Sequence, residues 1–285
     1  MSKADGPIAS GSGETAVQSD VSPSVDADDD AILAVENVSK HYGSIVALED
    51  VSLSIKDNEV LSIVGDNGAG KSTFIKLLSG VIPATAGEFY MRDEETGKLG
   101  QIVLDSPTMA KRSGIETVFQ HMSLSMQHDV AANVFMGREP LKDGVSGKVL
   151  RRIDREQMER RSIEALDEIG FEIDPRAITG ELSGGQQQAI AVARALITDP
   201  RVVILDEPTA EVSVEGSQKI LDLIEELQAS GKTVIFITHN LEEVFEVADR
   251  IAVLRSGSLV TELENDGTID REELVGHMTG AIQQG

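Results

Sequence analysis

The stretch at residues 65–72 reads Gly-Asp-Asn-Gly-Ala-Gly-Lys-Ser and lies between two apolar segments. Residues 59–64, just before it, end in a short apolar run typical of a buried strand. Residues 72–79, just after it, are apolar at helical spacing and stop at Gly80, which favours the end of a helix. The stretch is therefore predicted to be a tight loop between a strand and a helix, which places the chain in the α/β class.

This predicted loop has the composition of a phosphate-binding site, because its spacing fits G-x-x-x-x-G-K-[ST]. Glycines let backbone N–H groups approach phosphate oxygens, and a helix N-terminus adds positive potential. In such a loop Lys71 is a mobile cation for the outer phosphates and the Ser72 hydroxyl is a Mg²⁺ ligand. A chance glycine-rich turn is the alternative, but the strand, loop and helix occur in the required order. The predicted nucleotide-binding residues are Gly65, Asp66, Asn67, Gly68, Ala69, Gly70, Lys71, Ser72 and Thr73.

Two carboxylates follow a second apolar strand, residues 202–205. Continuous apolar runs mark strands buried on both faces of a parallel sheet, and ligands bind at the carboxyl ends of such strands. Asp206 is predicted to hold Mg²⁺, and Glu207 to polarise an attacking water. Acids at a strand end are often only solvated loop residues, but the phosphate loop favours the functional interpretation.

Two further polar residues end predicted strands. Residues 115–120 end in Gln120, and this strand is expected to run beside the phosphate-loop strand and bring the amide near the metal. Residues 233–239 end in His239, which could hydrogen-bond a γ-phosphate at the same sheet edge. A terminal glutamine is usually a solvated loop residue and a lone histidine is more often structural, so both alternatives stay open.

A second glycine-flanked helix start occurs at Ser183, which forms a predicted capping box with Gln186 three residues later. A capped helix does not need Gly184 and Gly185 in its first turn, so this helix start is also a candidate anion site. Tyr42 could stack on a purine base, although a tyrosine in a strand is more often a packing residue.

The chain divides into three parts by composition. Residues 1–30 have almost no large apolar residues and are predicted to be a disordered acidic tail. Residues 31–280 form one predicted domain that begins with antiparallel strands. Within it, residues 121–181 show helical spacing and are predicted to be a helical insert.

The charge balance is strongly acidic, with 49 Asp and Glu against 25 Lys and Arg and a net charge of -24. A nucleic-acid binder usually shows the opposite balance. The charge indicates a protein adapted to a high-salt cytoplasm, or else an ordinary acidic protein. The absence of cysteine excludes disulfides, thiolate zinc sites and iron–sulfur clusters. Without a membrane-length apolar run or a signal peptide, the chain is expected to stay in the cytosol.

Together, residues 31–280 resemble the ATPase subunit of ATP-binding cassette (ABC) transporters, because five motifs occur in that family's order. The phosphate loop matches Walker A, Gln120 the Q-loop, residues 182–186 the signature, residues 202–207 Walker B, and His239 the switch histidine. Tyr42 matches the aromatic adenine-stacking position. The resemblance implies a mixed sheet core with flanking helices, an antiparallel β subdomain and a helical subdomain.

The resemblance also implies partners and a mechanism. In that family two cassettes pair head to tail, with ATP and Mg²⁺ between the signature of one and Walker A of the other. Glu207 would be the general base, and the helical insert would pass the motion to transmembrane permease subunits. The expected partners are a second ATPase chain (a homodimer), the permease and, indirectly, an extracytoplasmic solute-binding protein, with no nucleic acid. The expected location is the cytoplasmic side of the membrane.

One departure concerns residues 210–213, which read Ala-Glu-Val-Ser where the family usually reads Ser-Ala-Leu-Asp. Similar loosening occurs in monosaccharide importers, and residues 118–121, 137–140 and 184–188 also look like that subfamily. The resemblance therefore implies an importer of a simple sugar. The alternatives are an exporter ATPase, a soluble ABC ATPase without a transport role, and a nucleotide switch that does not hydrolyse ATP.

Overall fold

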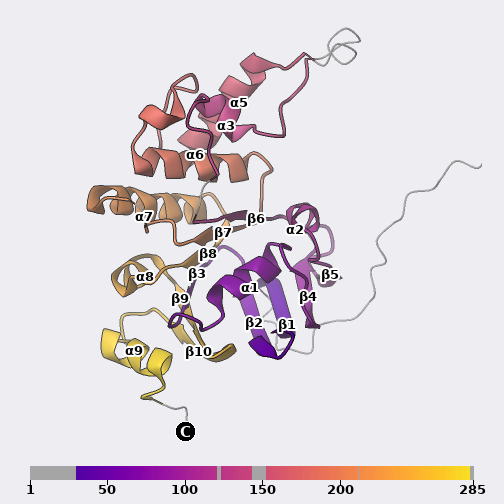
Figure 1. Cartoon of the computed structure of the whole chain (residues 1–285), viewed down its shortest axis with the longest axis vertical. Coiled ribbons are helices and arrows are strands. Elements are labelled where there is room, and N and C mark those ends of the chain that lie inside the picture. The colour runs from indigo at the N-terminus through magenta and orange to yellow at the C-terminus, as the bar shows by residue number, and fades with distance from the viewer. Residues whose placement is uncertain (1–29, 121–122, 143–151, 211, 283–285) are drawn as a thin grey trace, which may run out of the picture.

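The structure is a computed structural model that describes residues 30–120, 123–142, 152–210 and 212–282. These residues form two sheets and a group of helices that projects from one side (Figure 1). Apart from Asp30, the predicted acidic tail lies outside the described residues, and so does Glu211 of the departing loop.

The smaller sheet is antiparallel and has the strand order β2-β1-β4-β5. Its strands are β1 (Ala31–Tyr42), β2 (Ile45–Lys56), β4 (Ala86–Arg92) and β5 (Leu99–Ile102). Strand β1 stays paired with β2 up to Tyr42, and Leu99–Ile102 pair with β4.

The larger sheet has the order β10-β9-β3-β8-β7-β6 and is parallel except for its β10 edge. Its strands are β3 (Val60–Val64), β6 (Ile115–Val118), β7 (Val202–Asp206), β8 (Thr233–Ile237), β9 (Arg250–Arg255) and β10 (Ser258–Glu264). The expectation that the strand before Gln120 runs beside β3 is wrong, because β8 and β7 lie between them. These two strands are almost entirely buried apolar residues, which suits central positions covered on both faces, and β6 takes the edge.

The described helices are α1 (Lys71–Leu78), α2 (Pro107–Arg112), α3 (Val130–Val134), α5 (Arg155–Asp167), α6 (Gly184–Leu196), α7 (Val214–Ala229), α8 (Leu241–Val247), α9 (Arg271–Thr279) and the 3-10 turn η1 (Thr179–Glu181). Helix α1 buries Phe74 and Leu77 in a core shared by both sheets. The helices α3, α5 and α6 form the projecting group in Figure 1 and share a second core with α7 and the opposite face of the larger sheet. The insert is therefore packed on the domain by a continuous apolar core.

Candidate functional site

The carboxyl ends of β3, β8 and β7 meet at one edge of the larger sheet, as expected for parallel neighbours. The glycine-rich loop follows β3 at this edge and leads into α1. Gly65 has a φ of 153°, and a Cβ there would lie 2.2 Å from the carbonyl oxygen of Leu254. Gly70 has a φ of 110°, and its Cβ would lie 2.6 Å from a methyl group of Leu48. Only glycine fits at both places, so the loop can lie this close to β9 and β2.

Helix α1 begins with free donors. Its N-cap is Gly70, which has a left-handed conformation. Among the described residues no side chain caps this helix, and its first turn holds no acidic residue. The first backbone N–H groups, those of Lys71, Ser72 and Thr73, therefore lack an intrahelical partner and carry the positive end of the helix dipole. This is the arrangement that binds a phosphate group.

The Lys71 side chain folds back over the loop. Its Nζ donates hydrogen bonds to the carbonyl oxygens of Gly65 at 2.5 Å and Asp66 at 3.2 Å. Burial lowers the pKa of Lys71, and the negative charges of Glu207, Asp66 and Asp206 partly oppose that shift. The ammonium group thus lies between the loop and the carboxylates of Asp206 and Glu207 at the end of β7.

Asp206 is the last residue of β7 and is half-buried. Burial raises the pKa of its carboxyl group, and the neighbouring charge of Glu207 raises it further, whereas Lys76 and Lys71 lower it. Glu207 has a φ of 48°, a left-handed conformation that costs a non-glycine residue about 1–2 kcal/mol. Its backbone N–H donates to the carbonyl oxygen of Ile237 at 2.9 Å, which fixes this turn against β8.

His239 follows β8 at the same edge. Its Nδ1 lies 3.7 Å from Oε2 of Glu207, and its side chain is 70% exposed. The structure therefore brings together the loop, Lys71, Asp206, Glu207 and His239. Gln120 lies two residues beyond β6, at the carboxyl edge of the sheet but on its far side from β3.

Sequence reasoning missed one residue here, Glu243 of α8, which is 7% exposed. Its Oε2 accepts hydrogen bonds from the hydroxyl groups of Thr209 and Thr238, each at 2.8 Å, and its Oε1 accepts from Asn240 at 3.1 Å. The sequence does contain a signal for Glu243, because it is a carboxylate on the apolar side of a short helix just after His239. Glu243 ties the loop after Glu207 to the loop around His239.

Ser183 caps α6 as predicted. Its hydroxyl accepts from the backbone N–H of Gln186 at 3.3 Å, and the Gln186 side chain accepts from the Ser183 backbone at 3.0 Å. Gly185 has a packing role that the sequence did not indicate. A Cβ placed on Gly185 would lie 3.7 Å from the Cα of Gly216 in α7, so the two helices are in close contact here. Since α6 belongs to the projecting helices in Figure 1, the structure does not bring this motif together with the loop of its own chain.

Tyr42 ends β1, and its side chain is 47% exposed. The Nζ of Lys40 lies 5.2 Å from the centre of its ring. The adjacent strand β2 contacts the phosphate loop through Leu48 beside Gly70, which places this hairpin next to the loop. An exposed ring at this place is available to a flat ligand.

The donors at this sheet edge suit Mg²⁺, which prefers oxygen ligands from a few side chains and keeps waters and phosphate oxygens for the rest. Ser72 offers a hydroxyl, Asp206 a carboxylate and Gln120 an amide oxygen. The described residues hold no cluster of three or more His, Cys, Asp or Glu side chains that could enclose a metal alone. Burial, and then the charge of Glu207, raise the pKa of Asp206, and a divalent cation would counter both effects by stabilising the carboxylate.

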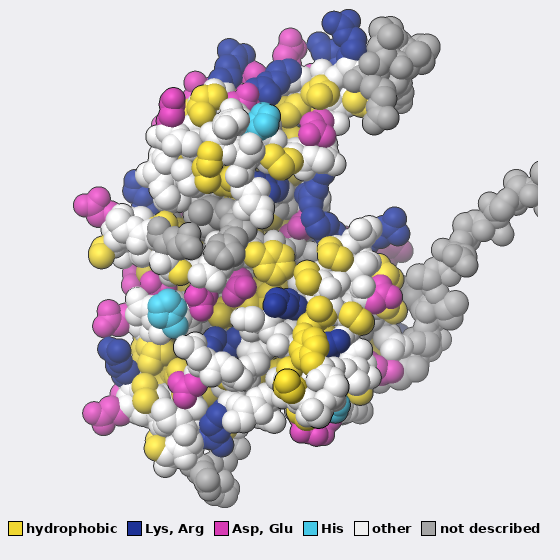
Figure 2. All heavy atoms as spheres, in the orientation of Figure 1, with side chains coloured by type: hydrophobic (Ala, Val, Ile, Leu, Met, Phe, Trp, Pro, Cys, Tyr) yellow, Lys and Arg dark blue, Asp and Glu magenta, His cyan; other side chains and the backbone are white. Residues whose placement is uncertain are grey.

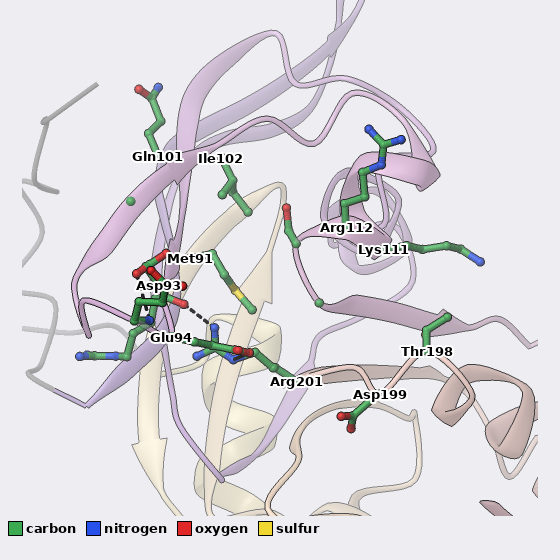
Figure 3. Close-up of a pocket in the computed structure, with 15 residues that line it drawn as sticks. Met91, Asp93, Glu94, Gln101, Ile102, Lys111, Arg112, Thr198, Asp199 and Arg201 are labelled. Carbon is green, nitrogen blue, oxygen red and sulfur yellow. Dashed lines mark hydrogen bonds and ion pairs between the residues drawn. The ribbon is translucent and has the colours of Figure 1, made fainter. Parts of the chain in front are cut away.

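A cavity of about 550 Å³ lies away from this edge, between β4, β5, α2 and the start of β7 (Figure 3). None of the predicted site residues lines it. Three guanidinium groups line it: Arg92 donates to the carbonyl oxygens of Ala31 and Gly97, Arg201 lies 3.6 Å from Glu94, and Arg112 lies at the exposed end of α2. Two of these three groups therefore make contacts within the protein.

A smaller cavity of about 170 Å³ lies between β6 and α6. Three cations, Lys111, Arg138 and Arg194, line it together with Glu116, which binds Lys111 at 3.2 Å and Arg138 at 2.8 Å. Burial and the charge of Arg138 lower the pKa of Arg194. Figure 2 shows a hollow between the projecting helices and the α2 region, with Lys and Arg side chains on its walls.

The loop, the helix dipole and the two carboxylates at one sheet edge define a phosphate-loop nucleotide-binding protein. A family model described as ABC transporter matches residues 48–210. The chain belongs to the ABC transporter family. In the described residues no helix is both long and apolar enough to cross a membrane.

Relatives with curated names agree with this family. The chain is 39% identical to the "Fructose import ATP-binding protein FrcA" of Rhizobium meliloti over 88% of this chain and 94% of that protein. It is 38% identical to the "Ribose import ATP-binding protein RbsA 3" of Rubrobacter xylanophilus over 87% of this chain, but it spans only 48% of that longer protein. It is also 38% identical to the "Galactofuranose transporter ATP-binding protein YtfR" of Escherichia coli O157:H7, over 80% of this chain and 43% of that protein.

Solved structures share the fold. A nucleotide-free ATP-binding cassette from an ABC transporter superposes with a TM-score of 0.71 at 27% identity, over 87% of this chain and 95% of that one. A dimeric cassette in a post-hydrolysis state, bound to ADP and Pi, superposes with a TM-score of 0.65 at 30% identity, over 83% of this chain and 100% of that one. The predicted mixed sheet core with flanking helices and an antiparallel sheet is confirmed.

Proposed function

We propose that this protein is the ATP-binding and ATP-hydrolysing subunit of an ABC importer for a simple sugar. The observation that carries the proposal is the uncapped start of α1, with Lys71 over the loop and Asp206 and Glu207 beside it at the same sheet edge. Such a site holds a nucleoside triphosphate by its phosphates and keeps a base at the outer end.

The residues take distinct roles in this proposal. Tyr42 stacks on the adenine, and residues 65–73 donate backbone N–H groups to the phosphates. Lys71 leaves its carbonyl partners and binds the outer phosphates. The negative charge of the phosphates then balances the positive charge of the partly buried ammonium group. Ser72, Asp206 and Gln120 would hold Mg²⁺, whose chemistry here is to neutralise charge on the phosphates.

Hydrolysis needs a general base and a group that hydrogen-bonds the γ-phosphate. Glu207 is held by its backbone in a fixed, strained turn and accepts the proton of the attacking water. His239, 3.7 Å from it, donates a hydrogen bond toward the γ-phosphate and orients the base. The rate enhancement arises from positioning and charge, because the phosphoryl group needs little covalent help.

We further propose that two copies of the chain pair head to tail. The donors of Ser183, Gly184, Gly185 and Gln186 start a helix that lies in the insert, so they serve the nucleotide of the other copy. The chain covers 94% of the length of its relative FrcA, which supports pairing between two copies of one chain. The dimer would sit at the cytoplasmic face of the membrane on permease subunits, fed by an extracytoplasmic solute-binding protein, with no role for nucleic acid.

Size-exclusion chromatography of the Glu207→Gln protein in molar KCl, with and without ATP and Mg²⁺, tests the ATPase mechanism. The variant keeps the shape of the side chain but not the base, so ATP is expected to bind, resist turnover and convert monomer to dimer. The Lys71→Ala protein is the control that should stay monomeric. Absence of any shift, with ATP binding shown separately, would contradict the homodimer and point to a second kind of cassette subunit.

The sugar is tested in cells. The names of the relatives support a monosaccharide cargo. Deletion of the gene is expected to lower uptake of radiolabelled fructose or ribose, and the wild-type gene should restore uptake while Glu207→Gln should not. Unchanged uptake of both sugars and of galactose would argue for a different cargo.

A further inference from the structure

A two-residue turn joins β9 to β10 beside the phosphate loop. Arg255 pairs with Ser258, and the two residues between them, Ser256 and Gly257, have φ values of 50° and 86°. Two successive left-handed residues are typical of a type I′ hairpin turn, which favours glycine at its second position. The hairpin therefore accounts for the conformation of Gly257, but not for the contacts that its peptide groups make outside the hairpin.

Gly257 connects the phosphate loop to strand β2. Its backbone N–H donates to the carbonyl oxygen of Ala69 at 3.0 Å, and its own carbonyl oxygen accepts from the backbone N–H of Glu49 at 2.8 Å. The approach is close, because a Cβ on Gly257 would lie 3.0 Å from the carbonyl oxygen of Ala47 and 3.4 Å from the Cα of Leu48. The turn is thus fixed to β2 on one side and holds the loop on the other.

The hydrogen bond to Ala69 sets the direction of the next N–H group in the loop. The carbonyl group of Ala69 and the N–H group of Gly70 belong to one planar trans peptide unit, so they point in opposite directions. Since the carbonyl group points at Gly257, the Gly70 N–H group points away from the turn. A glycine has no Cβ to restrict it, so this peptide unit needs a bond from outside the loop to keep one orientation.

The nucleotide leaves this bond in place. The Nζ of Lys71 also holds the loop in the structure, through the carbonyl oxygens of Gly65 and Asp66. In the proposed function, Lys71 gives up both contacts when it binds the outer phosphates. The bond from Gly257 to Ala69 uses only backbone atoms and is not exchanged for a phosphate, so it continues to orient the loop in the bound state.

We propose that Gly257 is a positioning residue for nucleotide binding, which holds the Ala69 carbonyl group and thereby keeps the Gly70 N–H group directed at the phosphates. Gly257 acts through Gly70 and does not itself touch the nucleotide. The inference rests on the proposed function, because it takes residues 65–73 to hold the phosphates. It extends the site to the turn between β9 and β10, which belongs to none of the five sequence motifs.

Gly257→Ala tests this role, because the added Cβ forces the turn away from β2 by a few tenths of an ångström and moves the Gly257 N–H group with it. Gly231→Ala is the matched control. Gly231 has a φ of 85°, and no described atom lies within 4 Å of its Cβ position, so alanine there meets the same backbone strain without a neighbour. Calorimetry measures the Kd for ATP and for inorganic tripolyphosphate, in molar KCl with EDTA to prevent hydrolysis.

We expect Gly257→Ala to raise the Kd for both ligands about 3- to 10-fold, the factor that one weakened hydrogen bond supplies. Tripolyphosphate has no base, so its loss of affinity reports on the phosphate loop alone. Gly231→Ala should lower the melting temperature as Gly257→Ala does and keep both Kd values within about twofold of the parent. Gly257→Asn adds the same Cβ, but asparagine tolerates a left-handed conformation better, so it serves if Gly257→Ala folds poorly.

Three results would overturn the inference. If Gly257→Ala and Gly257→Asn bind both ligands as the parent does, the turn does not orient the loop. If Gly231→Ala weakens binding as much as Gly257→Ala, the effect follows stability alone. If Gly257→Ala weakens ATP but leaves tripolyphosphate unchanged, Gly257 acts on the hairpin of β1 and β2 and not on the phosphates. A parent protein that binds neither ligand would instead contradict the proposed nucleotide site itself, and the role of Gly257 with it.

Discussion

The hydroxyl group of Thr209 donates a hydrogen bond of 2.8 Å to Oε2 of Glu243. Thr238 donates to the same oxygen at 2.8 Å. Thr209 lies two residues after Glu207, and Thr238 directly precedes His239, so one buried carboxylate joins the loop of the proposed base to the loop of the proposed γ-phosphate sensor. The 3.7 Å between Glu207 and His239 therefore depends on a residue that need not touch the nucleotide.

Glu243→Gln should lower the kcat for ATP hydrolysis about tenfold and leave the Kd for ATP within twofold. Glutamine keeps the shape but has one acceptor oxygen where Glu243 uses two, so it cannot accept from the two threonine hydroxyl groups and from the Asn240 amide at once. Part of the contact between the two loops is therefore lost. A loss of about 1.4 kcal/mol in positioning corresponds to the tenfold change. Steady-state hydrolysis and calorimetric ATP binding measure the two quantities.

Glu242→Gln is the matched control for this substitution. Glu242 is the adjacent residue, its side chain is 79% exposed, and its partner is Arg271 at 3.4 Å, so its loss should leave kcat unchanged. Equal kcat values for the Glu243→Gln and wild-type proteins would show that the hydrogen bonds of Glu243 to Thr209 and Thr238 have no role in turnover.

Asp206→Asn should stabilise the protein without nucleotide while it lowers its activity. The folded pKa of Asp206 lies above its unfolded value because of burial and the charge of Glu207. As pH rises from about 4, the unfolded chain ionises first, so the native protein loses stability until its own carboxyl group is ionised. The variant avoids that loss, and its melting temperature should exceed that of the wild type at pH 7 and approach it near pH 3.5.

The same variant should need far more Mg²⁺ for half-maximal hydrolysis, because an amide is a weaker ligand than a carboxylate. Melting curves between pH 3.5 and 8, in EDTA and in Mg²⁺ with ATP, measure both effects. A variant that is less stable than the wild type at pH 7 in EDTA would show that Asp206 contributes a favourable interaction in the apo protein.

Much of this site follows from local sequence. The strand, glycine loop and helix at residues 59–79 occur in the structure as predicted, because three glycines in six residues and a helix terminator leave few other conformations. The capping box of Ser183 and Gln186 is likewise a local feature, and it is confirmed at 3.0 Å and 3.3 Å. Asp206 and Glu207, at the end of β7, lie at the ligand edge because the rest of their strand is apolar on both faces.

The rest depends on contacts between distant segments, which no local pattern specifies. The position of Gln120 was predicted from the wrong strand neighbour, since strand order is set by which strands bury best in the centre. The bond from Thr209 to Glu243 spans 34 residues and that from Asn133 to Thr179 spans 46. A buried carboxylate or amide can be expected to have partners, but only the fold says which they are.

Tyr42→Ala should weaken ATP binding about 3- to 10-fold, while Tyr42→Phe should bind as the wild type. Stacking depends on the ring and contributes about 0.5–1.5 kcal/mol beyond its buried area. The ring is 47% exposed, so neither change should alter the melting temperature without nucleotide by more than a degree or two. Calorimetric titration with ATP measures the effect. Equal affinity in all three proteins would assign the ring to packing with Lys40 alone.

The melting temperature should rise steadily between about 0.1 M and 2 M KCl, which we propose as a sign of adaptation to high salt. The chain carries 49 acidic against 25 basic residues, and mutual repulsion of this excess opposes the compact state. Added salt shortens the screening length from about 10 Å to 3 Å or less, so the repulsion falls. Sucrose at equal osmolality is the control, because it stabilises proteins by exclusion from their surface but does not screen charge. If sucrose raises the melting temperature as much as KCl does, the acidic surface is not the cause, and a melting temperature that does not respond to KCl would contradict the adaptation altogether.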